Sequence, residues 1–202
     1  MKNRKLVSDI ALDGLFIAII AILTFVPYIG FIPLGFVSVT IIHIPVILGA
    51  IVFGWNRGAL YGTAFGLASL IQAAQQPAGT LDAVFINPVI SIVPRLLFGI
   101  ITGLLAGLLF KIIPNKKINR LLISVVAFIG TAFHTTFVFF AVGMFHPEYF
   151  NWVVAGGFAF FMLFEGIAAA LLVSVLYFAL AKQFESRLLK YSEKEEEEYD
   201  GF

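Results

Sequence analysis

The sequence predicts an all-α, polytopic membrane protein with six transmembrane helices and both termini in the cytoplasm. The first observation behind this prediction is composition: 60% of the residues are hydrophobic, 12% are charged and the mean hydropathy is +1.00. Soluble domains carry about twice that share of charge. The second is a series of apolar runs of about 18 or more residues, long enough to span a bilayer as helices. These runs lack the alternation of a membrane β-barrel.

Each expected element begins and ends at a recognisable signal. Proline and glycine in the connection 27–36 end the first helix near Pro27, and this apolar connection is expected to fold over the outer surface. Residues 55–58 are expected to form a tight turn, and 72–87 form the longest polar interruption. We expect helices at 9–27, 37–54, 58–73, 88–111, 120–144 and 152–181.

The distribution of positive charge predicts the orientation. Lysine and arginine gather at the N-terminus, at Arg57, in 111–120 and in 182–190. The three connections on the other side contain neither residue, and cytoplasmic loops carry the excess of positive charge. The chain therefore divides into a cytoplasmic N-terminus (1–8), a membrane domain (9–181) and a charged cytoplasmic tail (182–202), whose acidic run is expected to be solvated and disordered.

Small residues mark two helices as close neighbours of other helices. In the first, Ala11, Gly14, Ala18 and Ala21 lie along one side, a spacing that lets another helix approach closely. Ordinary packing within the chain and docking of a partner subunit both remain open for this face. The third helix is rich in glycine and alanine over 58–68, so we expect it to be central in the bundle.

Arg95 is the candidate on which the functional prediction depends. It follows the stretch NPVISIVP and lies inside the apolar run of the fourth helix, whereas the other lysines and arginines lie outside such runs. An ionisable residue within a membrane segment is costly and by default indicates a functional site or a buried partner. Its guanidinium is a planar fork of donors that suits a carboxylate or phosphate.

The other interior polar residues predict a cavity open to the outside. At a rise of about 1.5 Å per residue, Arg95 and His43 lie roughly 10 Å below the outer surface, with His134 somewhat deeper. Glu165 is expected deeper again. Because these groups are confined to the outer half, a pocket closed towards the cytoplasm fits better than a channel. Neutral donors and acceptors for a small ligand are expected at the rim, from Asn87, Gln72, Gln76 and Asn151.

A structural explanation of Arg95 also stays open, in which it pairs with Glu165 and only joins two helices. The difference in expected depth, about 10 Å along the helices, argues against a direct pair.

Several chemistries have no support in the sequence. There is no GxxxxGK[ST] phosphate loop for ATP hydrolysis, no HExxH or other clustered metal ligands, and no nucleophile-elbow motif. The absence of cysteine excludes disulfides and thiolate chemistry. We therefore expect no catalytic residues, no bound metal and no cofactor in this chain, and nucleic-acid binding is unsupported.

With these features, the chain resembles the substrate-binding S component of energy-coupling factor (ECF) vitamin importers. The Gly14-x-x-x-Ala18 spacing is similar to the AxxxA-type motif in the first helix of that family, with Gly14 as a departure. The stretch HIPVILGAIVFGWNRGALYGTAFGLASLI (43–71) is similar to the family's helix 2–3 hairpin, although Trp55 and Asn56 replace the usual Gly-Pro-type turn. NPVISIVPRLLFG (87–99) resembles the start of its fourth helix. The resemblance covers roughly 9–181.

The resemblance implies a function and a set of partners. Such a subunit binds its vitamin from outside, with the loops after helices 1 and 3 as lids. It docks through the first helix onto a transmembrane coupling subunit driven by two ATPases, then topples in the membrane of the bacterial cell to deliver the vitamin. The HIPV and NPxxSxxPR stretches look most like the pantothenate-specific members, in which Arg95 would meet the carboxylate.

Three alternatives remain open. The ligand could be pyridoxine, hydroxymethylpyrimidine, riboflavin or folate rather than pantothenate. A small membrane-embedded enzyme would require a second acidic or histidine residue close to Arg95. A purely structural bundle would tolerate replacement of Arg95 without loss of any ligand.

Overall fold

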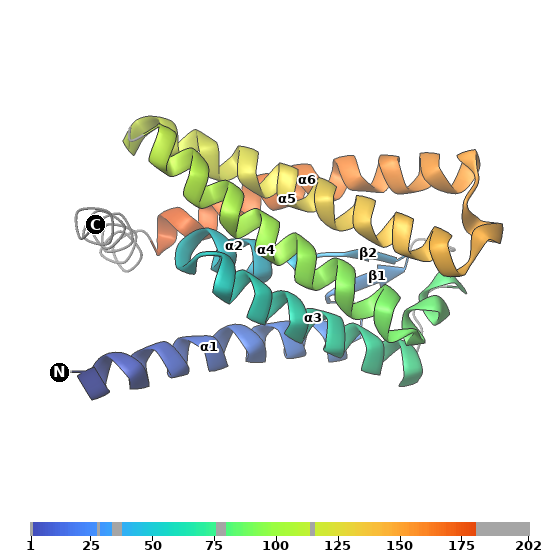
Figure 1. Ribbon diagram of the computed structural model, residues 1–202, viewed down its shortest axis with the longest axis horizontal. Helices are drawn as coiled ribbons and strands as arrows, with labels where there is room; N and C mark the ends of the chain where they lie inside the picture. Colours follow the sequence, from blue (N-terminus) through green and yellow to red (C-terminus); the bar gives the residue numbers. More distant parts are fainter. Residues whose placement is uncertain (1, 28, 34–37, 76–79, 114–115, 181–202) are drawn as a thin grey trace, which may run out of the picture.

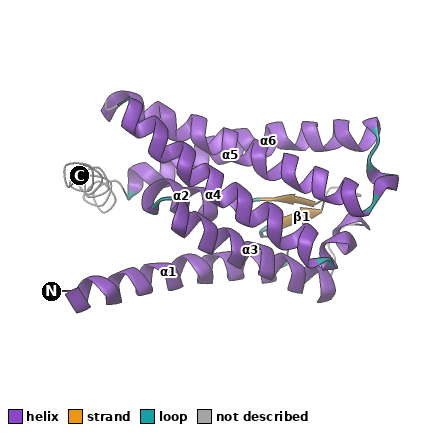
Figure 2. Cartoon of the chain, in the orientation of Figure 1, coloured by secondary structure: helices purple, strands orange, loops and turns teal. Residues whose placement is uncertain are grey.

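The computed structural model describes residues 2–27, 29–33, 38–75, 80–113 and 116–180, and within these ranges the protein is a helical bundle (Figures 1 and 2). The prediction of a helical fold is confirmed, with one addition, a short two-stranded hairpin. The elements in chain order are α1 (Lys2–Phe25), β1 (Phe31–Pro33), β2 (Ser38–Thr40), α2 (His43–Phe53), α3 (Trp55–Gln75), η1 (Thr80–Ile86), α4 (Pro88–Ile112), α5 (Lys116–Phe145), η2 (Pro147–Tyr149) and α6 (Trp152–Ala179).

The largest departure from the predicted boundaries is at α2. A helix was expected from 37, but residues 38–40 form β2, which pairs antiparallel with β1 so that Phe31 lies opposite Thr40. Two local preferences explain this result. Val39 and Thr40 are β-branched and favour extended backbone. Pro45 lacks an N–H and is tolerated only in the first turn of a helix, so the helix cannot begin far before His43.

The turn between α2 and α3 is also shorter than predicted. It is formed at Gly54, whose φ of 84° lies in the left-handed region, and α3 begins immediately afterwards at Trp55. The predicted turn at 55–58 is therefore wrong. Glycine is the residue that adopts this conformation without a steric penalty, and it commonly ends a helix in this way.

Three of the described helices are long and apolar enough to cross a membrane: Pro88–Ile112, Leu121–Phe145 and Trp152–Ala179. The predicted second span, 37–54, is not one of these three. Its helix, α2, has only 11 residues and is about 16 Å long at the helical rise, whereas a span needs about 20 residues. All of its residues are buried within the protein. The start of α1 and the end of α6 lie at the same end of the bundle (Figure 1).

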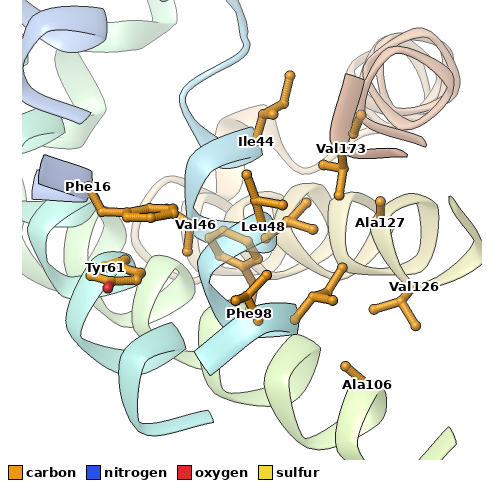
Figure 3. Close-up of a cluster of buried hydrophobic side chains, with 14 of the residues drawn as sticks. Phe16, Ile44, Val46, Leu48, Tyr61, Phe98, Ala106, Val126, Ala127 and Val173 are labelled. Carbon is orange, nitrogen blue, oxygen red and sulfur yellow. The ribbon is translucent and has the colours of Figure 1, made fainter. Parts of the chain in front are cut away.

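The core forms around α2. Its apolar side chains meet Phe16 from α1, Tyr61 from α3, Phe98 from α4, Val126 from α5 and Val173 from α6 (Figure 3). A short helix that is apolar on every side is stable only when it is surrounded. The surrounding helices thus bury it from several directions, and the cavity described below lies beyond its N-terminal end.

Glycines bring α3 and α4 into backbone contact, as expected for a central helix rich in small residues. A Cβ on Gly62 would clash with the carbonyl of Arg95, and a Cβ on Gly66 would lie 2.7 Å from the Cα of Ile92. Gly58 of α3 and Gly99 of α4 exclude a Cβ from each other in the same way. This contact fixes the height and rotation of α4 beside α3, and hence the position of Arg95.

Helix α1 lies along α3 at the edge of the bundle (Figure 1). It buries Phe16, Ile20 and Thr24, which recur every fourth residue on one side. At its N-terminal half, Asp13 Oδ1 accepts hydrogen bonds from Arg57 Nε and from the Tyr61 hydroxyl, each 2.6 Å long. These bonds join α1 to α3 and leave the opposite face of α1 uncovered.

Candidate functional site

A cavity lies among the hairpin, η1 and helices α4, α5 and α6. Its empty space, which includes solvent at the open mouth, is about 660 Å³. Aromatic and branched side chains form most of the wall, and six polar or ionisable residues interrupt it. The lining residues are Phe31, Thr40, Asp82, Val84, Phe85, Arg95, His134, Thr135, Val138, Val142, Phe158, Phe161 and Glu165.

Arg95 is buried in this cavity, with 3% of its surface exposed, as its position in an apolar run suggested. Its Nη1 donates to the carbonyl oxygen of Ile90 at 2.8 Å. Pro94 explains why this carbonyl is available, because proline has no N–H to donate to the carbonyl four residues earlier. Pro94 therefore leaves the Ile90 carbonyl free to accept a hydrogen bond from Arg95, the next residue in the chain.

The remaining contacts of the guanidinium do not satisfy its Nε–H. Its Cζ lies 4.5 Å from the centre of the Phe85 ring and 5.5 Å from that of Phe65, within the range of cation–π attraction. Arg95 Nε is buried and has no hydrogen-bond partner in the described structure. A buried guanidinium with an unpaired N–H, at the wall of a cavity, can bind an anionic group of a small molecule.

Two acidic residues share the cavity with Arg95, and neither was predicted to line it. Glu165 of α6 is 7% exposed, and its Oε1 accepts a hydrogen bond of 2.7 Å from the backbone N–H of Thr40 in β2. In the described part of the chain its direct partner is thus the hairpin rather than Arg95. Asp82 lies on η1 and is 6% exposed. The expected difference in depth, counted along straight helices, placed Glu165 too far from Arg95, since both residues line one cavity.

The two predicted histidines lie together. His134 lines the cavity, and its ring stacks on that of His43 with the ring centres 5.7 Å apart. Phe98 meets the edge of His134 at 5.0 Å. Neither histidine has a hydrogen-bond partner for its ring nitrogens in the described residues. His134 can therefore offer a hydrogen bond to a ligand, whereas His43 supports it from α2.

Three of the four amides predicted for the rim are not among the described residues that line the cavity. Asn87 and Asn151 are N-caps: Asn87 Oδ1 accepts from Val89 N–H, and Asn151 Oδ1 accepts from the N–H groups of Val153 and Val154. Neither these two residues nor Gln72 is among the described residues that line the cavity. Gln76 lies outside the described residues.

The small residues predicted for partner docking lie on the uncovered face of α1. Ala11, Gly14 and Ala18 are exposed and Ala21 is half-buried. A Cβ on Gly14 would meet no other atom within 4 Å. Packing within the described part of the chain does not use this face.

Together, the fold and the cavity define a class: a helical membrane protein with a largely apolar cavity that presents a few polar groups, suited to a small polar molecule. Comparison with known proteins gives the family. The model of the family described as "ECF transporter, substrate-specific component" matches residues 8–177, so the chain belongs to that family. Its members are substrate-binding subunits of transporters, not enzymes, which removes the enzyme alternative.

Two similar proteins have curated names. The chain is 32% identical to the pantothenic acid transporter PanT of Lactococcus lactis subsp. cremoris, over 90% of this chain and 97% of that protein. It is 38% identical to the pantothenate transporter PanT of Leuconostoc mesenteroides, in an alignment that spans 52% of each chain.

Proposed function

We propose that this chain captures pantothenate at the outer face of the bacterial cell membrane and carries it inward as the S component of an ECF importer. The observation that supports the ligand most directly is Arg95, a buried cation with an unpaired Nε at the cavity wall. Pantothenate carries a carboxylate that can accept from this donor. The names of the two similar proteins support the same ligand.

The rest of the cavity suits the rest of that molecule. The amide and hydroxyl groups of pantothenate require acceptors and donors, which Thr40, Thr135 and His134 offer along the wall. Its branched, apolar middle requires a hydrophobic surface, which the phenylalanines and valines offer. A cavity that is mostly apolar, with a few well-placed polar groups, is typical of specific small-molecule sites.

Transport requires partners that this chain does not contain. In the proposed mechanism the exposed small residues of α1 dock onto the transmembrane coupling subunit, and two ATPase subunits drive the complex. The loaded protein then reorients in the membrane and releases its ligand into the cytoplasm. The uncovered face around Gly14 supports α1 as the docking helix, since a partner helix can approach it closely.

A binding titration on the detergent-solubilised, full-length protein tests the ligand. Pantothenate is compared with pyridoxine, hydroxymethylpyrimidine, riboflavin and folate, for the wild type, Arg95→Gln and Lys111→Gln. Lys111 is the matched control because it is an exposed cation on the same helix, outside the cavity. We expect pantothenate to bind the wild type and Lys111→Gln equally and Arg95→Gln at least a hundredfold more weakly, about 2.7 kcal/mol.

Other results would change the proposal in defined ways. Tight binding of a neutral vitamin, unaffected by Arg95→Gln, would replace pantothenate with that vitamin and return Arg95 to a structural role. Equal binding of pantothenate by Arg95→Gln would contradict the assignment of its carboxylate to this residue.

A further inference from the structure

Among the described residues that line the cavity, carboxyl groups outnumber permanent cations. Arg95 contributes one positive charge, and Asp82 and Glu165 contribute two carboxyl groups. All three are at least nine-tenths buried. This balance is tolerable in the unliganded protein, because Arg95 lies in the same cavity as both acids and offsets part of their charge.

An anionic ligand disturbs this balance. When a carboxylate binds Arg95, the ligand neutralises that cation, and Glu165 loses the positive charge in the cavity that offset its own. Ionised groups removed from water without a counter-charge are strongly disfavoured, and a carboxyl group in that position takes up a proton instead. An ionised Glu165 in the same buried cavity as a ligand carboxylate, with Arg95 bound to that ligand, is thus an unfavourable arrangement.

We propose that the cavity binds its anionic ligand together with one proton, which the Glu165 carboxylate takes up from solvent. This inference rests on the proposed function, since it requires a ligand that carries a carboxylate. The proton comes from water or buffer and forms an O–H bond on Oε2, while Oε1 keeps the hydrogen bond from Thr40 N–H. No bond of the ligand changes, and the charge of the ligand is matched by the charge of the proton.

Glu165 is the better proton acceptor of the two acids because of its place in the fold. It lies on α6, 13 residues after the first residue of that helix, about 20 Å along the axis. Asp82 lies on η1, in the connection between α3 and α4, at the end of the bundle. The group further from bulk water gains more from losing its charge.

The other titratable groups around Glu165 are less suited to take up the proton. Arg95 faces it from α4 and keeps its proton while it binds an anion. His134 faces the cavity from α5, and His43 of α2 stacks on His134. Their ring nitrogens have no hydrogen-bond partner among the described residues, and a protonated ring beside Arg95 would add repulsion between like charges.

Isothermal titration of the full-length protein with pantothenate tests this inference. At pH 7.5, titrations in HEPES and in Tris, which differ in ionisation enthalpy and contain neither phosphate nor carboxylate, give the number of protons taken up per ligand. We expect close to one proton for the wild type, and a dissociation constant that rises up to tenfold per pH unit above neutrality. The carboxylate of pantothenate is already ionised in this range and contributes none of this uptake.

Two variants locate the proton. Glu165→Gln keeps an oxygen acceptor for Thr40 N–H but cannot titrate, so proton uptake should fall to near zero and the pH dependence should disappear. Asp82→Asn removes the other acid and should leave the uptake near one. The titration of the wild type measures proton uptake by itself. It therefore still tests the inference if a variant fails to fold.

The outcomes separate this inference from the proposed function. Binding of pantothenate by the wild type without proton uptake overturns the inference and leaves the function intact. Uptake that persists in Glu165→Gln overturns the assignment to this residue. No binding of pantothenate at all overturns the proposed ligand, and the inference with it.

Discussion

Replacing Gly62 with alanine should weaken ligand binding without touching the cavity. Gly62 lies on α3, and a Cβ at this position would clash with the carbonyl of Arg95 and lie 2.9 Å from its carbonyl carbon and 3.3 Å from the Cα of Leu96. Ordinary contacts begin near 3.4 Å. The neighbouring atoms belong to the backbone and cannot rotate away, so α4 must shift by roughly 0.5–1 Å or the helices must separate.

The size of the effect follows from this shift. Overpacking a close contact costs about 1–3 kcal/mol of stability. A displacement of Arg95 that lengthens its hydrogen bonds to a carboxylate should remove part of a charge-assisted interaction worth about 1.5–3 kcal/mol. We therefore expect the affinity for pantothenate to fall about tenfold, equivalent to 1.4 kcal/mol, together with a lower unfolding temperature.

Gly107→Ala is the matched control. Gly107 lies on α4 itself, and a Cβ there would meet nothing within 4 Å. Both substitutions carry the same gain in helix propensity, about 1 kcal/mol, so their difference isolates the steric effect. Pantothenate titration and thermal unfolding of the purified protein measure the two consequences. If Gly62→Ala matched Gly107→Ala in both, the close α3–α4 contact would not position Arg95.

Two further predictions concern docking and the histidine pair. Gly14→Leu combined with Ala18→Leu should leave pantothenate binding unchanged but abolish uptake in cells that express the coupling subunit and ATPases, because leucines there would block a partner helix. Uptake at the wild-type rate would place the docking surface elsewhere. His134→Phe keeps an aromatic ring against His43 and removes two unpartnered polar atoms, so stability should be kept or raised while affinity falls about tenfold. Unchanged affinity would assign His134 a structural role.

The sequence was sufficient to single out Arg95 and His134, but it did not predict that Asp82 and Glu165 line the same cavity. A charged residue in an apolar run stands out because its desolvation must be compensated somewhere. Asp82 and Glu165 reach the same cavity from η1 and α6, which are far apart in the sequence, and no local pattern indicates that they meet. Glu165 also contacts the hairpin, whose formation was not predicted from the connection 27–36.

The role of Asn87 and Asn151 was also not predicted from the sequence. Asparagine before an apolar helix has two common uses, as a ligand group or as an N-cap, and periodicity does not distinguish them. In the structure Asn87 and Asn151 bond the first N–H groups of α4 and α6. The first N–H groups of every helix lack a partner within the helix. An asparagine just before a helix is therefore often used to cap it.

If the proposed ligand is correct, the environment of Arg95 explains how the cavity would select an anion. Burying a guanidinium is unfavourable, and the Ile90 carbonyl and the Phe85 ring offset only part of that cost. The unpaired Nε leaves about 1–3 kcal/mol of unsatisfied hydrogen bonding in the unliganded protein. A ligand that accepts from Nε recovers this energy, whereas a ligand of the same shape without an acceptor leaves the donor buried and unpaired. Under the proposed function, discrimination would arise from the empty site as well as from the contacts of the filled one, because Arg95 Nε stays unpaired in the described structure until a ligand carboxylate accepts from it.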